Sequence, residues 1–254
     1  MSSLLSINNL TVAVGSKALV DQVSFDVPEG KIVAIAGGSG SGKTTIGLSI
    51  LRLLPSALNI KQGSIVFEGQ DLLQLSSESM RQQRGAHIGM VFQEPLSAFD
   101  PLFTIGQQID EVLAAHTELS VQERYKKVLD ILVEVELPDP ERAHGSYPHQ
   151  LSGGMRQRAM VALAYVCGPS LIIADEPTSS LDVTLQVKIM ELLIRLKKKN
   201  VSILLIAHDL GMISHIADEV IILNQGHVVE KGPVAQVIGD PRHEYTKELV
   251  GAFQ

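Results

Sequence analysis

The sequence has one cysteine, no tryptophan and few aromatic residues, and each scarcity excludes a class of protein. The 254 residues include a single cysteine, Cys167, which rules out a disulfide framework and any cysteine-rich zinc or iron–sulfur site. Aromatic residues make up 4% of the chain, which argues against a stacking platform for single-stranded nucleic acid. Lys and Arg number 21 against 28 Asp and Glu, a net charge of −7. A general nucleic-acid-binding surface is therefore disfavoured.

Long apolar runs are missing as well. The longest purely apolar stretches, such as 203–207 and 220–223, are far shorter than the ~18 residues of a membrane-spanning helix. The first residues lack the basic region and the apolar core of a signal peptide. We therefore expect a soluble, cytoplasmic protein.

The hydrophobic pattern predicts an α/β core with a helical insert. Apolar and polar residues alternate over Leu5–Val14, as in a half-buried strand, and Ile32–Ala36 is apolar throughout, as in a strand buried on both faces. Helical periodicity dominates from 93 to 168. We expect one domain over 1–254, with an α/β core made of 1–92 and 169–254 and a mostly helical insert over 93–168. Further strands are expected at 18–27, 63–68, 87–92, 171–174, 202–206 and 219–223.

A glycine-rich loop follows the apolar strand and fits the phosphate-loop pattern G-x-x-x-x-G-K-[ST]. Glycines allow the backbone to turn so tightly that its N–H groups converge on phosphate oxygens, and the next helix adds its positive N-terminal end. The lysine supplies a cation for the β- and γ-phosphates, and the threonine hydroxyl can ligate Mg²⁺. The loop consists of Gly37, Gly38, Ser39, Gly40, Ser41, Gly42, Lys43 and Thr44.

Two further segments carry chemistry. The apolar strand 171–174 ends in Asp175 and Glu176, where a carboxylate can reach Mg²⁺ at the carboxyl end of a sheet and a second one can deprotonate an attacking water. Ser152, Gly153 and Gly154 open a helical run. Ser152 is a good N-cap, and two successive glycines also leave N–H groups available to an anion.

These segments, taken in order, resemble the nucleotide-binding subunit of ATP-binding-cassette (ABC) transporters over essentially the whole chain. Residues 151–158 match the family's signature motif. The resemblance implies a P-loop NTPase core with a mostly parallel sheet, an N-terminal antiparallel β subdomain and an inserted helical subdomain. It also implies ATP and Mg²⁺ as cofactors, and ATP hydrolysis as the reaction.

The resemblance assigns roles to individual residues. Gln93 resembles the Q-loop glutamine, which ligates Mg²⁺, and Ser180-Leu181-Asp182 resembles the D-loop, which crosses to the opposite subunit. His208 resembles the switch histidine, which contacts the γ-phosphate. The implied catalytic residues are Lys43, Glu176 and His208, and the implied metal ligands are Thr44, Gln93 and Asp175. Residues implied to contact ATP are Val14, Gly37–Thr45, Gln93, Ser152, Gly153, Gly154 and Asp182.

One position departs from the family pattern. Val14 stands where an aromatic residue usually stacks on adenine, and it offers a methyl surface without a π-face. Recognition of the base is therefore expected to be weak.

The resemblance also implies partners and a location. Two ATPase subunits, identical or homologous, would enclose two ATP molecules and energise two permease subunits at the cytoplasmic face of the inner membrane. A solute-binding protein would act upstream, and nucleic acid would not be a partner. The alternatives are a soluble ABC ATPase acting on ribosomes or DNA, and a regulatory cassette without hydrolysis. The net charge of −7 and the lack of a tandem cassette or a coiled-coil insertion oppose the first alternative. The presence of Lys43, Glu176 and His208 opposes the second.

Two segments resemble the peptide and nickel importers within this family, namely 93–105 and 241–249. Peptide importers commonly carry a cysteine-bearing C-terminal extension, which this sequence lacks. The shorter form, together with residues 36–43 and 97–101, more closely resembles the nickel-import subunits. We therefore expect import of nickel or a related transition-metal complex, with dipeptide or oligopeptide import as the alternative.

Overall fold

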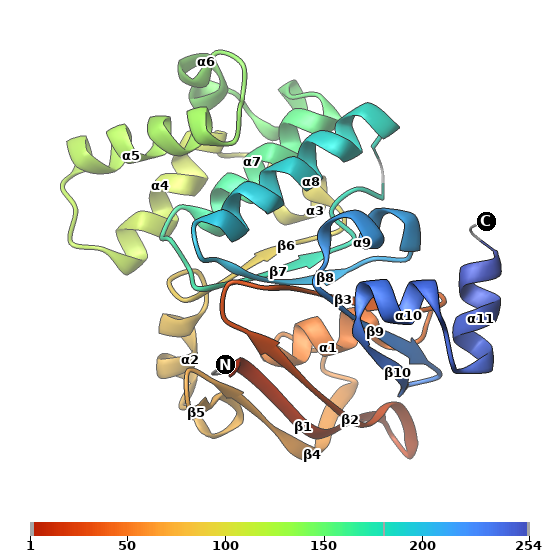
Figure 1. Ribbon diagram of the computed structural model, residues 1–254. Helices are drawn as coiled ribbons and strands as arrows, with labels where there is room; N and C mark the ends of the chain where they lie inside the picture. The colour runs from red at the N-terminus through yellow and green to blue at the C-terminus, as the bar shows by residue number, and fades with distance from the viewer. Residues whose placement is uncertain (1–2, 180, 253–254) are drawn as a thin grey trace. The chain divides into compact units, whose positions relative to one another are not determined.

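A computed structural model of the chain describes residues 3–179 and 181–252. The chain divides into two compact units (Figure 1). The first, called here the core unit, comprises Met1–Met80 and Lys197–Gln254, and the second, the insert unit, comprises Arg81–Leu196. The boundaries expected from the sequence, 93 and 168, refer to subdomains of the resembled family and stay a prediction.

The core unit begins with an antiparallel sheet in the order β2-β1-β4-β5. Its strands are β1 (Ser3–Val14), β2 (Lys17–Pro28), β4 (Leu58–Phe67) and β5 (Gln70–Asp71). Leu5, Ile7, Leu10 and Val12 of β1 are buried, as the alternating pattern predicts. An N-terminal antiparallel sheet is thus confirmed.

A second group of strands in the core unit has the order β10-β9-β3-β8. It contains β3 (Ile32–Ala36), β8 (Ser202–Ile206), β9 (Glu219–Asn224) and β10 (His227–Pro233). β3 is parallel to both β8 and β9, whereas β10 is antiparallel to β9. Every residue of β3 and β8 is buried. Because parallel strands end at the same edge, the loops after β3 and β8 leave from one edge of the sheet.

Short helices complete the core unit. They are α1 (Lys43–Ile50), α9 (Leu210–Ile216), α10 (Val234–Gly239) and α11 (Glu244–Gly251), with the 3-10 turn η1 (Leu72–Gln74). Helix α2 (Ser77–Gln83) runs from this unit into the insert unit. Figure 1 shows α10 and α11 following β10 at the end of the chain.

The insert unit pairs β6 (Ile88–Val91) in parallel with β7 (Leu171–Asp175). Its helices are α3 (Pro95–Ala98), α4 (Ile105–His116), α5 (Val121–Glu134), α6 (Pro140–Gly145), α7 (Gly153–Tyr165) and most of α8 (Val183–Lys198), with the turn η2 (Pro148–Gln150). Capping boxes begin α4 at Thr104 and α5 at Ser120. The segment from 93 to 168 is helical, as its periodicity predicts.

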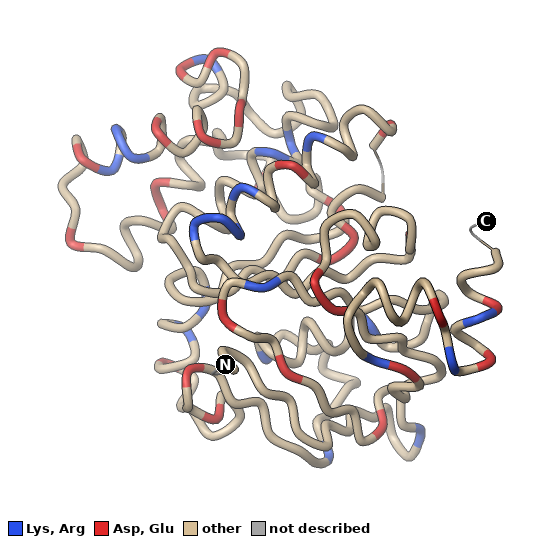
Figure 2. Tube along the Cα trace, viewed as in Figure 1, with Lys and Arg blue, Asp and Glu red and all other residues tan. Residues whose placement is uncertain are grey.

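Helix α5 carries charges of both signs, on Glu123, Arg124, Lys126, Lys127 and Asp130 (Figure 2). Such a mixture is typical of a solvated helix face. Among residues 3–179 and 181–252, no helix combines the length and the apolar character that crossing a membrane requires.

Cys167 lies shortly after α7 and is half-buried. Its Sγ atom is 4.0 Å from the carbonyl oxygen of Val112. Burial raises the pKa of the thiol, although the charge of Lys127 acts in the opposite direction.

Candidate nucleotide site

The glycine-rich loop directly follows β3 and folds against neighbouring backbone. Gly37 has φ +154° and Gly42 has φ +104°, values that side-chain-bearing residues rarely adopt. A Cβ atom on Gly37 would lie 2.1 Å from the carbonyl oxygen of Leu223, and one on Gly42 would lie 2.9 Å from that of Leu19. The tight turn expected from the motif is present, and it leaves no room for side chains at these two positions.

Lys43 begins α1 and turns back over the loop. Its side chain is 6% exposed, and its Nζ donates to the carbonyl oxygens of Gly37 and Gly38, each at 2.9 Å. The N-cap, Gly42, has no side chain with which to cap the first-turn N–H groups of α1. The ammonium group and the helix N-terminus therefore lie together, and both attract anions.

The loop also contains an orphaned polar atom. Ser41 Oγ is buried without a hydrogen-bond partner in the described part of the chain, a state that usually has a cause, such as a missing ligand or ion. The Ser41 carbonyl oxygen accepts the N–H of Gly226 from the β9–β10 turn at 3.1 Å. The loop is held by a backbone hydrogen bond to Gly226, and it carries the Ser41 hydroxyl, unpaired among the described residues, and the buried Lys43. These features fit the phosphate groups of a nucleotide.

His208 leaves the sheet from the same edge as the glycine-rich loop. Ile206 of β8 is paired with Ile35 of β3, and the Ala207 N–H donates to the Ile35 carbonyl at 3.2 Å. The His208 side chain is exposed. The predicted switch histidine and the predicted phosphate loop are thus delivered to one edge by the register of two parallel strands.

The other predicted residues of the core unit lie nearby in sequence. Thr44 is exposed and Thr45 half-buried in the first turn of α1. Val14 is the last residue of β1, is 39% exposed, and is paired with Lys17 and Leu58. Its predicted contact with the base stays a prediction.

In the insert unit, the structure joins two predicted residues directly. Gln93 follows β6 and Glu176 follows β7, and these strands are paired through Val91 and Ala174. Gln93 Nε2 donates to Glu176 Oε2 at 3.0 Å. Glu176 has φ +43°, a left-handed conformation that is strained for a glutamate. The predicted catalytic carboxylate is therefore held in an unusual backbone conformation and oriented by the Gln93 amide.

The predicted magnesium ligands have suitable chemistry. Asp175 ends β7 with 3% exposure, and the Gln93 amide nitrogen is bonded to Glu176, which leaves the amide oxygen to ligate a cation. Together with the Thr44 hydroxyl these are oxygen ligands, the kind that Mg²⁺ prefers. They belong to two units, Thr44 to the core unit and the others to the insert unit.

The signature segment begins α7. Ser152 is the N-cap, and its hydroxyl accepts the Met155 N–H at 3.4 Å. A Cβ on Gly154 would lie 2.9 Å from the methyl groups of Leu185, whereas one on Gly153 would meet Leu181 Cδ2 at 3.8 Å. The segment just before α8, which resembles the D-loop, thus packs beside the signature glycines.

Asp182 has a local structural role in addition to its predicted one. Its Oδ1 accepts the Leu185 N–H at 3.0 Å, so it caps the start of α8. Ser180, which the resemblance also places in the D-loop, lies outside the described residues.

Sequence reasoning missed two contacts that support the site. The Gly38 N–H donates to the Tyr245 hydroxyl at 2.8 Å, and Asp218 Oδ2 accepts the Ile32 N–H at the start of β3 at 2.9 Å. Tyr245 falls in the segment 241–249 that was noted for its resemblance, but no local pattern indicates which backbone group it meets.

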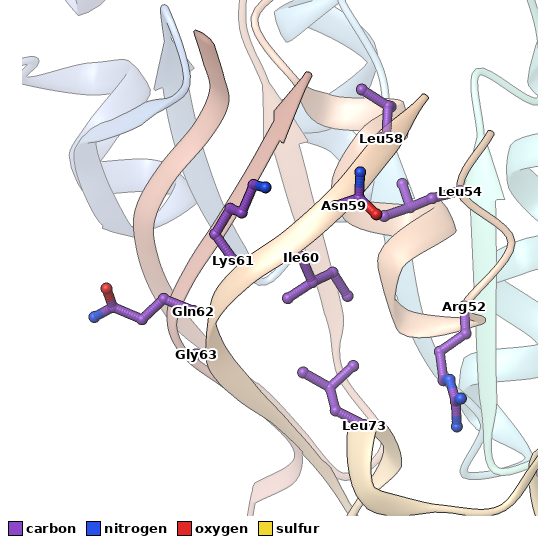
Figure 3. Close-up of a pocket in the computed structure, with 9 residues that line it drawn as sticks. All are labelled: Arg52, Leu54, Leu58, Asn59, Ile60, Lys61, Gln62, Gly63 and Leu73. Carbon is purple, nitrogen blue, oxygen red and sulfur yellow. The ribbon is translucent and has the colours of Figure 1, made fainter. Parts of the chain in front are cut away.

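The core unit also contains a pocket of about 530 Å³, lined by β4, by the segment that follows α1 and by η1. Figure 3 shows Ile60 of β4, Leu73 of η1 and Arg52 of the segment after α1 around this pocket. The guanidinium of Arg52 donates to the carbonyl oxygen of Leu75 at 2.6 Å. None of the described residues that line this pocket is among those predicted to bind the nucleotide.

Comparison with known proteins gives consistent matches. A family model described as ABC transporter matches residues 20–179. The peptidoglycan transport ATP-binding protein YejF of Agrobacterium fabrum is 45% identical over 98% of this chain and 47% of its own length. The dipeptide transport ATP-binding protein DppD of Haemophilus influenzae is 42% identical over 98% of this chain and 77% of its own. The chain thus spans about half of the first relative and about three-quarters of the second.

Solved structures agree in fold. The dimeric ATP-binding cassette MJ0796, in a post-hydrolysis state with ADP and Pi, is 29% identical with a TM-score of 0.81, covering 91% of this chain and 98% of its own. A second match, cbiO1 from Clostridium perfringens, described as part of the ABC transporter complex cbiONQ, is 25% identical with a TM-score of 0.82, covering 94% of this chain and 92% of its own. With the fold, the phosphate loop and a family match over more than half of its length, the chain belongs to the ABC transporter family and has the fold of its ATP-hydrolysing cassette.

Proposed function

We propose that this chain is the ATP-hydrolysing subunit of a membrane importer that carries peptides. The observation that carries the proposal is the buried Lys43 ammonium, folded over a glycine-rich loop at the N-terminus of α1. That arrangement suits a nucleoside triphosphate. The names of the relatives favour peptide cargo.

The reaction follows from the positions of the residues. Loop N–H groups and Lys43 hold the β- and γ-phosphates and stabilise the charge that develops as the terminal phosphoryl group departs. Thr44, Gln93 and Asp175 would hold Mg²⁺, which would neutralise charge on the phosphates. Water attacks the γ-phosphorus in line, the bond to the β-phosphate oxygen breaks, and ADP leaves with that electron pair. Glu176, oriented by Gln93, accepts the proton of the water, and His208 contacts the γ-phosphate.

Assembly into a dimer supplies the rest of the site. Ser152, Gly153 and Gly154 of one chain would face the nucleotide held by the phosphate loop of another chain. The dimeric cassette MJ0796 supports this arrangement by its similarity of fold. Two permease subunits would receive the opening and closing motion at the cytoplasmic face of a membrane, and a solute-binding protein would deliver the cargo.

Peptide cargo is favoured over nickel by the comparisons. The relatives reported above are named for peptidoglycan and dipeptide transport, and a further one, OppD of Bacillus subtilis, 40% identical over 100% of this chain and 72% of its own length, is named for oligopeptide transport. The expectation of nickel rested on the shorter form of the sequence and on the resemblance of residues 36–43 and 97–101, neither of which bears on the chemistry of the cargo. We therefore adopt the alternative.

Uptake by cells tests the cargo. Cells with and without this subunit are given a labelled dipeptide or radioactive nickel, and a Lys43→Ala strain serves as the control for a protein that is present but cannot use ATP. We expect peptide uptake to fall in both altered strains while nickel accumulation is unchanged. Loss of nickel uptake with normal peptide uptake would overturn the proposal.

A further inference from the structure

The C-terminal helix α11 contacts the phosphate loop through one side chain. Tyr245, in the first turn of α11, accepts the Gly38 N–H through its hydroxyl oxygen at 2.8 Å. The two residues are 207 positions apart in the chain. Gly38 lies at the start of the glycine-rich loop, before the N–H groups that precede Lys43.

The same peptide group is bound at both ends. The peptide that joins Gly37 to Gly38 donates its N–H to Tyr245, and its carbonyl oxygen, that of Gly37, accepts Lys43 Nζ at 2.9 Å. Because hydrogen bonds on the two ends of an amide polarise each other, each bond strengthens the other. The orientation of this peptide plane therefore decides where the Lys43 ammonium is held.

A second set of contacts places Tyr245. The carboxylate of Glu230, on β10, accepts the backbone N–H groups of Arg242 and His243, each at 3.0 Å. His243 Nδ1 accepts the Tyr245 N–H at 3.2 Å and so caps α11. Thr246 and Val250 are buried on the inner face of the helix. The tail is thus anchored to the sheet on both sides of Tyr245.

We propose that Tyr245 is a positioning residue for ATP binding, which acts on Lys43 through the peptide between Gly37 and Gly38. Its hydroxyl keeps that peptide turned so that the Gly37 carbonyl faces the lysine and the loop stays open to phosphate. The proposal rests on the proposed role of Lys43. It adds the tail of the chain to the nucleotide site, although the tail is remote from that site in sequence.

Removing one oxygen atom tests the proposal. Tyr245→Phe keeps the ring and deletes the hydrogen-bond acceptor, whose net contribution is about 1 kcal/mol. In the assembled transporter we expect the KM for ATP to rise about 3- to 10-fold, with kcat within about twofold and a melting temperature lowered by no more than about 2–4 °C. Tyr125→Phe, the same change on the exposed ring of α5, is the matched control and should leave both constants unchanged.

A double-mutant cycle separates positioning from packing. A Cβ on Gly38 would lie 3.1 Å from the Tyr245 hydroxyl oxygen, so Gly38→Ala should raise the KM in the wild-type chain by displacing the hydroxyl. It should add little in the Tyr245→Phe chain, where that oxygen is gone, because both changes act on one contact.

Three outcomes would overturn the proposal. They are an unchanged KM in Tyr245→Phe, a fall of kcat together with the melting temperature, and additive effects in the cycle. Lys43→Ala is measured in parallel. If it loses ATP binding while Tyr245→Phe does not, the nucleotide site stands and this inference alone fails, and if Lys43→Ala binds ATP normally, the site assignment fails as well.

Discussion

The carboxylate of Glu176, the predicted catalytic base, is oriented by its own backbone conformation and by a hydrogen bond. The residue follows a buried strand, has a left-handed backbone conformation, and accepts a hydrogen bond from Gln93 at 3.0 Å. Strained conformations persist where the surrounding structure imposes them, and they gather at functional sites. The orientation of this carboxylate is therefore set by its own backbone and by a residue 83 positions away.

Glu176→Gln isolates the proton-accepting role. The amide keeps the shape of the side chain and can still accept from Gln93, but it cannot take a proton from water. We expect the rate of phosphate release to fall about 100-fold or more, with ATP affinity unchanged. Glu191→Gln, on the exposed face of α8, should keep the wild-type rate. A Glu176→Gln protein that hydrolyses ATP normally would refute the assignment.

Val14, the residue predicted to lie beside the base, bears on the choice between ATP and GTP. It is 39% exposed at the end of β1 and has no aromatic plane, so at the predicted base position we expect no stacking, and binding would then come mainly from the phosphates. We expect ATP and GTP to bind to the purified chain within a few-fold of each other. Val14→Tyr should then tighten the binding of both nucleotides, because an aromatic ring stacks on either purine. A strong preference of the wild-type chain for ATP would show that another residue recognises adenine.

At the scale of elements, one carboxylate fixes the start of β3. Asp218 accepts the Ile32 N–H at 2.9 Å and is paired with Lys31 at 3.3 Å and Lys197 at 2.7 Å. Burial raises the pKa of the Asp218 carboxyl, but the hydrogen bonds from Lys197 and Ile32, the charge of Lys197 and the bond from Lys31 outweigh it, and the net pKa is lowered. The strand that carries the phosphate loop is thus anchored at its opposite end.

Asp218→Asn should destabilise the chain in a pH-dependent way. We expect a loss of about 2 kcal/mol at pH 7, because hydrogen bonds to a charged group are lost. The folded pKa lies below the unfolded value of about 3.9, so the contribution is complete above that pH and disappears as the pH falls through the folded pKa. Thermal melting of both proteins between neutral and acidic pH measures this. The exposed Asp240→Asn should match wild type throughout, and a gap between Asp218→Asn and wild type that stays constant down to acid pH would contradict the account.

The packing of α7 beside the start of α8 distinguishes two adjacent glycines. Among the described residues, a Cβ on Gly153 meets only Leu181 Cδ2, at 3.8 Å, whereas one on Gly154 meets Leu185 at 2.9 Å. Gly153→Ala should raise the free energy of unfolding by about 0.4–1 kcal/mol through the unfolded chain. Gly154→Ala should gain less, because Leu185 must move. Equal shifts in thermal melting would show that Leu185 adjusts without cost.

At the scale of the whole molecule, Gly153 also gives a test of the proposed ATP-dependent dimer. Because Gly153 has room in its own chain, Gly153→Asp should fold and bind ATP as a monomer. Its carboxylate would face the phosphates held by the other chain and prevent the ATP-dependent dimer. Size-exclusion chromatography in the Glu176→Gln background, with Gly145→Asp as the control at another uncrowded glycine, measures this. A collapse of monomer ATP affinity would show that the signature acts within one chain.

Much of the fold followed from local patterns. The alternation in β1 and the apolar run of β3 predicted strands that the structure confirms, because burial on one face or two leaves a direct trace in the order of residues. The first half of β4, 58–62, was missed, since it is mostly exposed and polar. β10 was missed for the same reason.

The site was predictable in its motifs and less so in its contacts. Each predicted motif is continuous in the sequence, so its residues and their spacing can be identified from the sequence alone. This holds for the phosphate loop, for the strand that ends at Asp175 and for the signature segment. The bonds Gln93–Glu176 and Gly38–Tyr245 join residues 83 and 207 positions apart. They depend on strand order and helix placement, which local periodicity does not specify. The roles of the individual site residues stay predictions until the variants above are measured.

The half-buried thiol of Cys167 makes this chain convenient for probe attachment. It is the sole cysteine of the sequence, and burial raises its pKa, so little thiolate forms near neutral pH to attack a maleimide. A new cysteine on an exposed helix, such as Glu248→Cys on α11, would carry the fluorophore selectively. Fluorescence can therefore test whether the C-terminal helix moves during nucleotide turnover, without first replacing the native cysteine.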